Sequence, residues 1–225
     1  MGILETVKSG VVQRALDKQS HKSSGKFKPS SFGKCFRRQV LERLGVPRSQ
    51  DIIIESELIK QDGIDKHNFI QSFYPKECCE VRFEDEHFKG FADIVTEDTV
   101  IDIKTVNTEA YTKMGKKGYS IYQNKEANIL QAGFYAIKLN KPSFELAFLD
   151  REAFSRSGGL AIACFSFDTA FLTQFILKEV DKLIEFWYNV NNSGVLPECE
   201  DRLFFGHECK FCEYKIECER RKNGA

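Results

Sequence analysis

The stretch that decides the fold runs from residue 88 to residue 105 and reads FKGFADIVTEDTVIDIKT. Residues 88–95 and 100–105 have the composition and alternation of short strands. The polar residues 96–99 between them are compatible with a hairpin turn. A further short strand is predicted just before them, at residues 79–83. This part of the chain therefore predicts the centre of a β-sheet.

The same stretch carries two carboxylates and a lysine. Side chains two positions apart in a strand point to the same face, so Asp102 and Lys104 share a face. If the two strands pair as a hairpin, Asp93 falls roughly opposite Asp102. Two neighbouring carboxylates repel each other and are costly to bury, and a hard divalent cation such as Mg²⁺ or Mn²⁺ would compensate for them. The alternative is a salt-bridged strand pair in which Lys104 neutralises one aspartate, and this pattern alone leaves both interpretations open.

Outward from this stretch, the sequence alternates helices and strands. Helices are predicted at 3–19, from Ser30 or Ser31 to about residue 44, at 51–73 with an interruption or tight turn near 62–63, at 123–139 and at 168–191. Two more strands are predicted at 144–149 and 160–167, and residues 106–122 are predicted to form a long basic loop that closes over a substrate. The order predicts an α/β fold with a mixed sheet. We expect one domain: an N-terminal helical part (1–75), a core (76–192) and a cysteine-rich tail (193–225) that packs with the N-terminal part.

Composition and charge fit a globular protein without identifying a partner. Hydrophobic residues make up 42% and charged residues 29% of the 225 residues, and the formal net charge is zero. We find no apolar run of transmembrane length and no signal peptide, so no membrane partner is expected and the predicted location is the cytoplasm. Charge is unevenly placed, because residues 1–50 carry a net charge of +8 and residues 104–125 a net charge of +4. Either segment would suit phosphates, although a solvated basic face explains the charge equally well.

Four short motifs occur in order along residues 63–135. They are Gly63-Ile-Asp-Lys-His67, Gly90-Phe-Ala-Asp93, Asp102-Ile-Lys104 and Gln131-Ala-Gly-Phe-Tyr135. In this order they resemble the RecB-like branch of the PD-(D/E)xK nucleases. The resemblance implies a restriction-endonuclease-like core, with a mixed central sheet flanked by helices. Asp102 stands where many relatives carry glutamate.

The resemblance also implies roles for these residues. Catalytic roles fall to Asp93, Asp102, Lys104, Gln131 and Tyr135, and ligation of Mg²⁺ or Mn²⁺ falls to His67, Asp93, Asp102 and the backbone carbonyl of Ile103. Lys104 would orient the attacking water, and Gln131 and Tyr135 would position the substrate strand. Taken singly, His67 is also compatible with an ordinary helix histidine, and the pair on the next helix with a core edge.

Three of the eight cysteines lie close together in the tail, at Cys209, Cys212 and Cys218. Thiolates at such spacing suit Zn²⁺ or an iron–sulfur cluster. The resemblance implies a 4Fe–4S cluster that uses Cys35 as the fourth ligand, since members similar to the CRISPR-associated exonucleases and AddB-type nucleases carry one N-terminal cysteine and three near the C-terminus. The competing interpretation is a Zn²⁺ site completed by Cys199 or His207. The remaining cysteines, Cys78, Cys79 and Cys164, are expected to be small core residues.

The sequence thus predicts a metal-dependent DNA nuclease. The resemblance favours an exonuclease acting on single-stranded DNA, with integrase or helicase partners as possibilities. The alternative is a catalytically silent or partner-activated DNA-binding subunit of a recombination, phage or CRISPR adaptation complex. For DNA binding we single out the basic residues Arg37, Arg38, Lys113, Lys116 and Lys117.

Overall fold

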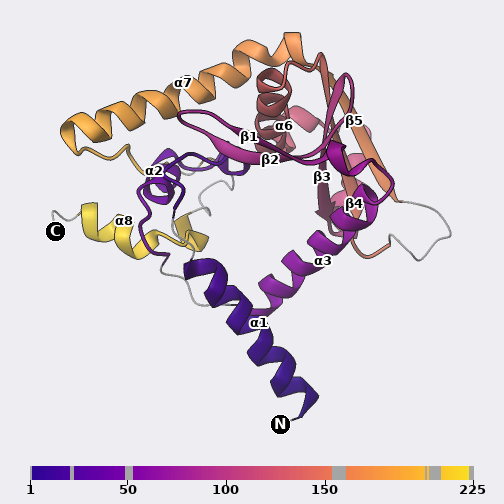
Figure 1. Cartoon of the computed structure of the whole chain (residues 1–225), viewed down its shortest axis with the longest axis horizontal. Helices are drawn as coiled ribbons and strands as arrows, with labels where there is room; N and C mark the ends of the chain where they lie inside the picture. Colours follow the sequence, from indigo (N-terminus) through magenta and orange to yellow (C-terminus); the bar gives the residue numbers. More distant parts are fainter. Residues whose placement is uncertain are drawn as a thin grey trace. The chain divides into compact units, whose positions relative to one another are not determined.

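The computed structural model describes residues 2–20, 23–48, 53–153, 161–200, 202 and 209–222. Figure 1 shows the elements along the chain. The helices are α1 (Ile3–Ser20), α2 (Phe36–Arg43), α3 (Ile54–Gln71), α4 (Thr108–Met114), α5 (Ile121–Asn124), α6 (Glu126–Lys138), α7 (Thr169–Ser193) and α8 (Lys215–Lys222), with 3-10 turns at Pro29–Ser31, Lys76–Cys78 and Cys209–Phe211. The strands are β1 (Cys79–Glu84), β2 (Lys89–Val95), β3 (Thr99–Val106), β4 (Ser143–Asp150) and β5 (Ile162–Asp168).

The strands form one mixed sheet in the order β1-β2-β3-β4-β5. The pair β3–β4 is parallel, and the pairs β1–β2, β2–β3 and β4–β5 are antiparallel. A parallel pair needs a long crossover connection, and the chain between β3 and β4 supplies it with α4, α5 and α6. The predicted α/β class with a mixed sheet flanked by helices is confirmed.

The chain divides into two compact units. One contains residues 28–33 and 62–182, with the whole sheet and α6, and we call it the sheet unit. The other contains residues 1–27, 34–61 and 183–225, and we call it the terminal unit because it includes both chain ends. Among the described helices, none combines the length and the apolar character that crossing a bilayer requires.

The two faces of the sheet are buried by different helices. Helix α6 packs along β3 and β4, and the buried Phe134 on it contacts Phe88 and Phe32 through ring pairs with centroids 5.0 and 5.1 Å apart. A second apolar cluster includes Ile94, Ile103, Ala147 and Leu149, against which Ile70 and Tyr74 pack at the end of α3. The alternation of β4 separates these layers, as expected for a strand with both faces buried.

Helix α3 runs through Asp62 and Gly63, so the predicted interruption there is wrong. A Cβ atom at Gly63 would lie 3.2 Å from Oγ1 of Thr105. The glycine therefore permits close approach of the helix to β3 and does not mark a turn.

Two other boundary predictions are also wrong. No single helix runs from Ser30 to about residue 44, because Gly33 adopts a positive φ of 73° between the 3-10 turn and α2. Residues 106–122 are not one loop, because α4 lies within them. The Asn107 side chain caps α4 by accepting a hydrogen bond from the Ala110 N–H over 2.9 Å.

Cys164 lies exposed on the edge strand β5, so the prediction that it is a core residue is wrong. Cys78 and Cys79 are only half-buried.

Candidate active site

The candidate site lies where β2 and β3 separate within the sheet unit. The strands are still paired at Ile94 and Ile101. One position further, the Asp93 carboxylate accepts a hydrogen bond from the Ile103 N–H, with Oδ2 and N 2.7 Å apart. The Asp93 side chain is therefore hydrogen-bonded to the backbone of the neighbouring strand. This bond fixes the Asp93 carboxylate beside the Asp102-Ile-Lys104 motif.

The Asp102 carboxylate is buried, and in the part of the chain that the structure describes only one of its two oxygens is paired. Its side chain is 3% exposed, and Oδ1 accepts a hydrogen bond from the Lys104 ammonium over 2.9 Å. The other oxygen, Oδ2, is buried and has no hydrogen-bond partner among the described residues. Burial raises the pKa of Asp102 to about 6, against the attraction of Lys104 and with a further contribution from the charge of Asp93.

The partner groups respond to the same charges. Burial raises the pKa of Asp93, while Lys104 and the Ile103 N–H oppose the shift. For Lys104, burial acts to lower the pKa, but the charges of Asp102 and Asp93 outweigh it, so the pKa is raised and the ammonium stays charged. Asp93, Asp102 and Lys104 thus lie together, as the sequence predicts.

His67 approaches the same place from α3. Its Nδ1 lies 3.7 Å from Oδ2 of Asp93. Burial, aided by the charge of Lys104, lowers the pKa of His67, so the neutral imidazole with a free lone pair is favoured at neutral pH. A neutral imidazole is the form that binds a metal ion.

Tyr135 supports the site from α6 and is 2% exposed. A Cβ atom at Gly90 would lie 2.1 Å from the Tyr135 hydroxyl oxygen, so only glycine leaves room for the tyrosine against β2. Burial raises the pKa of Tyr135, with further contributions from Asp102 and Asp93, so the phenol remains neutral. Gln131 lies one turn earlier on α6 and is half-buried. The Gly90 and Tyr135 motifs are therefore two sides of one packing contact.

Two residues near the site were not found from the sequence. The amide of Gln71, one turn after His67 on α3, donates to the Asp93 carbonyl and to the Glu80 carboxylate, each over 2.9 Å. Glu80 has a φ of 50°, which is rare for a residue with a side chain. The only sequence signal for Gln71 is its spacing of four from His67, which places both on one helix face. No sequence pattern marks Glu80.

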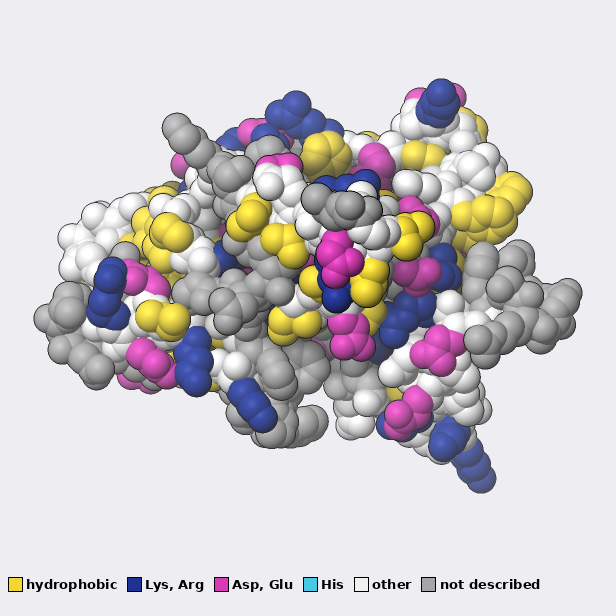
Figure 2. Space-filling model, turned by 90° about the horizontal axis from the view of Figure 1, so that it is seen from below, with side chains coloured by type: hydrophobic (Ala, Val, Ile, Leu, Met, Phe, Trp, Pro, Cys, Tyr) yellow, Lys and Arg dark blue, Asp and Glu magenta, His cyan; other side chains and the backbone are white. Residues whose placement is uncertain are grey.

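The structure places the predicted DNA-binding residues in different settings. Lys113 pairs with Glu109 over 2.7 Å, and Lys116 and Lys117 are exposed after α4. In the terminal unit, Nε of Arg37 donates to the Pro197 carbonyl over 2.7 Å. On the face drawn in Figure 2, described lysine and arginine side chains stand among acidic and hydrophobic ones.

Five cysteines line one pocket of the terminal unit. They are the predicted ligands Cys35, Cys209, Cys212 and Cys218, together with Cys199. The sulfur atoms of Cys199 and Cys209 lie 3.2 Å apart. Burial raises the pKa of Cys212 to about 11, so this thiol is protonated at neutral pH. His207, the other ligand considered for zinc, lies outside the described residues.

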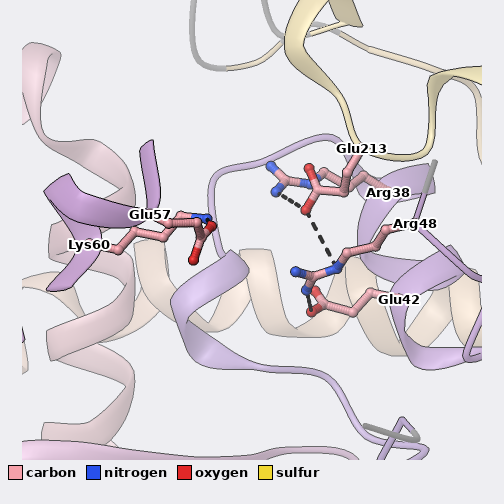
Figure 3. Close-up of polar contacts among 6 residues, drawn as sticks. All are labelled: Arg38, Glu42, Arg48, Glu57, Lys60 and Glu213. Carbon is pink, nitrogen blue, oxygen red and sulfur yellow. Dashed lines mark hydrogen bonds and ion pairs between the residues drawn. The ribbon is translucent and has the colours of Figure 1, made fainter. Parts of the chain in front are cut away.

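Two arginines are among the residues that line the pocket. Besides the cysteines, its lining includes Arg37, Arg38, Leu41 and Tyr214, and none of the described lining residues is a carboxylate. Nη1 of Arg37 lies 3.5 Å from the Cys218 sulfur. Figure 3 shows Arg38 paired with Glu213, which also faces Arg48, and these N···O distances are 2.7 and 3.9 Å. The arginines would offset the negative charge of metal-bound thiolates.

Within the described ranges, no group of three or more His, Cys, Asp or Glu side chains already has the arrangement of a metal site. The chemistry of the donors nevertheless fits two kinds of group. The buried, unpartnered Oδ2 of Asp102 suits a hard divalent cation. The five thiols suit a soft metal or an iron–sulfur cluster.

Comparisons with known proteins place the fold. No family model matches the sequence, and no curated protein sequence matches it. The crystal structure of SSO0001 is similar over 97% of this chain and 96% of its own, with a TM-score of 0.53 and 17% identity. The structure of LHK-Exo in complex with dAMP is similar over 84% of this chain and 98% of its own, with a TM-score of 0.51 and 16% identity. LHK-Exo is an alkaline exonuclease from Laribacter hongkongensis. The chain therefore has a fold that an exonuclease also has.

Proposed function

We propose that this chain is a metal-dependent deoxyribonuclease of the PD-(D/E)xK type, with Asp93, Asp102 and Lys104 at its active centre. The observation that carries the proposal is the buried Oδ2 of Asp102, which lies near a second carboxylate and has no hydrogen-bond partner in the described part of the chain. A salt bridge to Lys104 uses only the other oxygen. A divalent cation is the partner that such an oxygen lacks.

The residues that would hold the cation are Asp93, Asp102, the Ile103 carbonyl and His67. When bound, Mg²⁺ or Mn²⁺ supplies a Lewis acid that lowers the pKa of water and stabilises charge on a phosphodiester. Lys104 keeps its proton because its carboxylate neighbours raise its pKa. It would act as a fixed positive charge that orients the attacking water and stabilises the developing negative charge, and it would not act as a general base.

The buried Tyr135 would act through β2. Its hydroxyl packs against Gly90, three residues before Asp93. This contact fixes the strand that carries the carboxylate. Precise placement of the acidic groups is what such chemistry requires, because small displacements lower the rate steeply.

The substrate is proposed to be single-stranded DNA, cleaved from an end. Support comes from the resemblance to the RecB-like nucleases and from the fold shared with an alkaline exonuclease that has been seen with dAMP. The exposed Lys116 and Lys117, two and three residues after the end of α4, are the candidates for phosphate contacts.

The five-thiol pocket is proposed to hold a 4Fe–4S cluster through Cys35, Cys209, Cys212 and Cys218. Support comes from the convergence of thiols from both ends of the chain and from the nearby arginine side chains. Such a cluster would join α2 to the C-terminal tail inside the terminal unit. Because it would bind only the folded state, it would stabilise that unit.

The test is cleavage of 5′- and 3′-labelled single- and double-stranded DNA by anaerobically purified protein. We expect cleavage with Mn²⁺, none with EDTA, and loss of cleavage in Asp102→Ala. The matched control is Asp98→Ala, which removes an exposed carboxylate from the β2–β3 turn and should retain activity. If Asp102→Ala cleaves as well as the parent protein, the proposed centre is wrong. DNA binding without any metal-dependent cleavage would instead support a silent or partner-activated subunit.

A further inference from the structure

Three neighbouring strands place an acidic residue at the same level of the sheet. The pairing of Ile94 with Ile101 puts Asp93 beside Asp102 at the next position. On the other side, Cys79 pairs with Ile94 and Val81 pairs with Ala92, which puts Glu80 beside Asp93. Asp93 therefore has an acidic neighbour on each side, Glu80 and Asp102. Of these two, only Asp102 belongs to a sequence motif.

The backbone at Glu80 has a conformation that is unusual for a strand. Glu80 adopts the left-handed region, with φ of 50°, at the second residue of β1, between two positions that pair with β2. Residues with a side chain rarely adopt this conformation unless their surroundings hold them in it. Here the amide of Gln71 donates to the Glu80 carboxylate and to the Asp93 carbonyl, and so ties α3 to both strands at this point.

The charges of these residues favour a bound cation. Like charges on directly opposed positions of a strand pair are unfavourable. Three carboxylates and the Lys104 ammonium leave a formal charge of −2, which one divalent cation would neutralise. The buried oxygen of Asp102, which no described residue meets with a hydrogen bond, independently points to such a cation. Glu80 is exposed, so ions in the solvent can reach its carboxylate.

We propose that Glu80 is a third carboxylate of the metal centre and contributes to the binding of a divalent cation beside Asp93. The proposal rests on the proposed function and deepens it, because it extends the ligand-bearing strands from β2 and β3 to β1. It also gives Gln71 a role, as the residue that positions Glu80 toward the centre.

The experiment is Mn²⁺ binding to the full chain, measured by electron paramagnetic resonance and calorimetry, for the parent and for Glu80→Gln. Glutamine keeps the shape and can still accept the hydrogen bond from Gln71, so the change removes charge alone. We expect the Kd for Mn²⁺ to rise about tenfold or more, as for loss of a group that supports a metal site. In EDTA the unfolding midpoint of Glu80→Gln should equal or exceed that of the parent, because a repulsion is relieved.

Two further variants separate the possible failures. Glu97→Gln removes an exposed carboxylate from the β2–β3 turn and should leave the Kd unchanged. Asp102→Asn should abolish tight binding whatever the role of Glu80. If Glu80→Gln binds Mn²⁺ like the parent while Asp102→Asn does not, Glu80 is not part of the centre and the proposed nuclease centre stands. If the parent itself binds no Mn²⁺, both proposals are overturned.

Discussion

Replacing Asp102 with asparagine should abolish activity and yet make the metal-free protein more stable. Burial raises the pKa of Asp102 from 3.8 to about 6, with the attraction of Lys104 already included. That gap corresponds to about 3 kcal/mol of folding free energy lost when the carboxylate is ionised at pH 7. Asparagine has a similar shape and no charge. We therefore expect the metal-free variant to gain up to about 3 kcal/mol, or up to about 10 °C in the unfolding midpoint.

The pH dependence of the parent protein should have the same origin. Because the folded-state pKa is above the unfolded value of 3.8, the folded state holds this proton more tightly than the unfolded chain. The contribution of Asp102 to stability is fully present below about pH 4, is lost as the pH rises through about 6, and does not change above that. Asp102→Asn should lack this part of the pH dependence.

The assay is thermal unfolding followed by circular dichroism in EDTA and in Mn²⁺, from pH 4 to pH 8. Asp98→Asn, an exposed aspartate of the β2–β3 turn, is the matched control and should change little. Mn²⁺ should raise the midpoint of the parent but not that of Asp102→Asn, because ligand binding stabilises only a state that binds it. A lower midpoint for Asp102→Asn than for the parent at pH 7 in EDTA would refute the electrostatic reasoning.

Three other changes test separate parts of the structure. Gly90→Ala places a Cβ atom 2.1 Å from the Tyr135 hydroxyl oxygen and should cost about 1–3 kcal/mol of stability, measured by urea unfolding. Adding Tyr135→Phe to this variant should recover part of the loss. If the losses of the two changes simply add, the contact is wrong. Cys35→Ser should lower the iron and sulfide content of anaerobically purified protein, whereas Cys164→Ser, on the exposed edge strand, should leave both unchanged; equal contents in both variants would exclude Cys35 as a ligand. Lys117→Glu should weaken DNA binding and reduce its salt dependence by at least one phosphate contact, and an unchanged salt slope would remove this residue from the interface.

Much of the sheet could be predicted because its strands carry strong local signals. All five predicted strands are present, since apolar alternation and polar turns mark each of them. The errors fall where a tertiary contact decides the backbone. Gly63 looks like a turn residue, but its contact with Thr105 explains it. Gly33 breaks a predicted helix because it adopts a positive φ. The sequence does not predict the short helix α4, although Asn107 is a good N-cap, because a basic, Gly-containing segment also has the composition of a loop.

The candidate site could be predicted only in part. Ordered motifs predict His67, Asp93, Asp102 and Lys104 as site residues, and strand periodicity predicts that the last three lie close together. Glu80 has no motif, and its position beside Asp93 depends on the register of β1 against β2. Register is a property of paired strands and is not written in either strand alone.

A structural salt bridge and a metal site place different demands on the Asp102-Ile-Lys104 motif. A purely structural salt bridge should satisfy the buried carboxylate, because an ion pair removed from water is favourable only when the remaining lone pairs are also bonded. Lys104 donates to Oδ1 of Asp102, and Oδ2 stays buried with no hydrogen-bond partner within the described ranges. The pKa of Asp102 is raised to about 6 because the attraction of Lys104 does not fully offset the effect of burial. A chain that needed only stability would lose nothing by replacing this aspartate with a neutral residue. The presence of a carboxylate there, beside Asp93 and at the point where β2 and β3 part, therefore favours a site built to receive a cation.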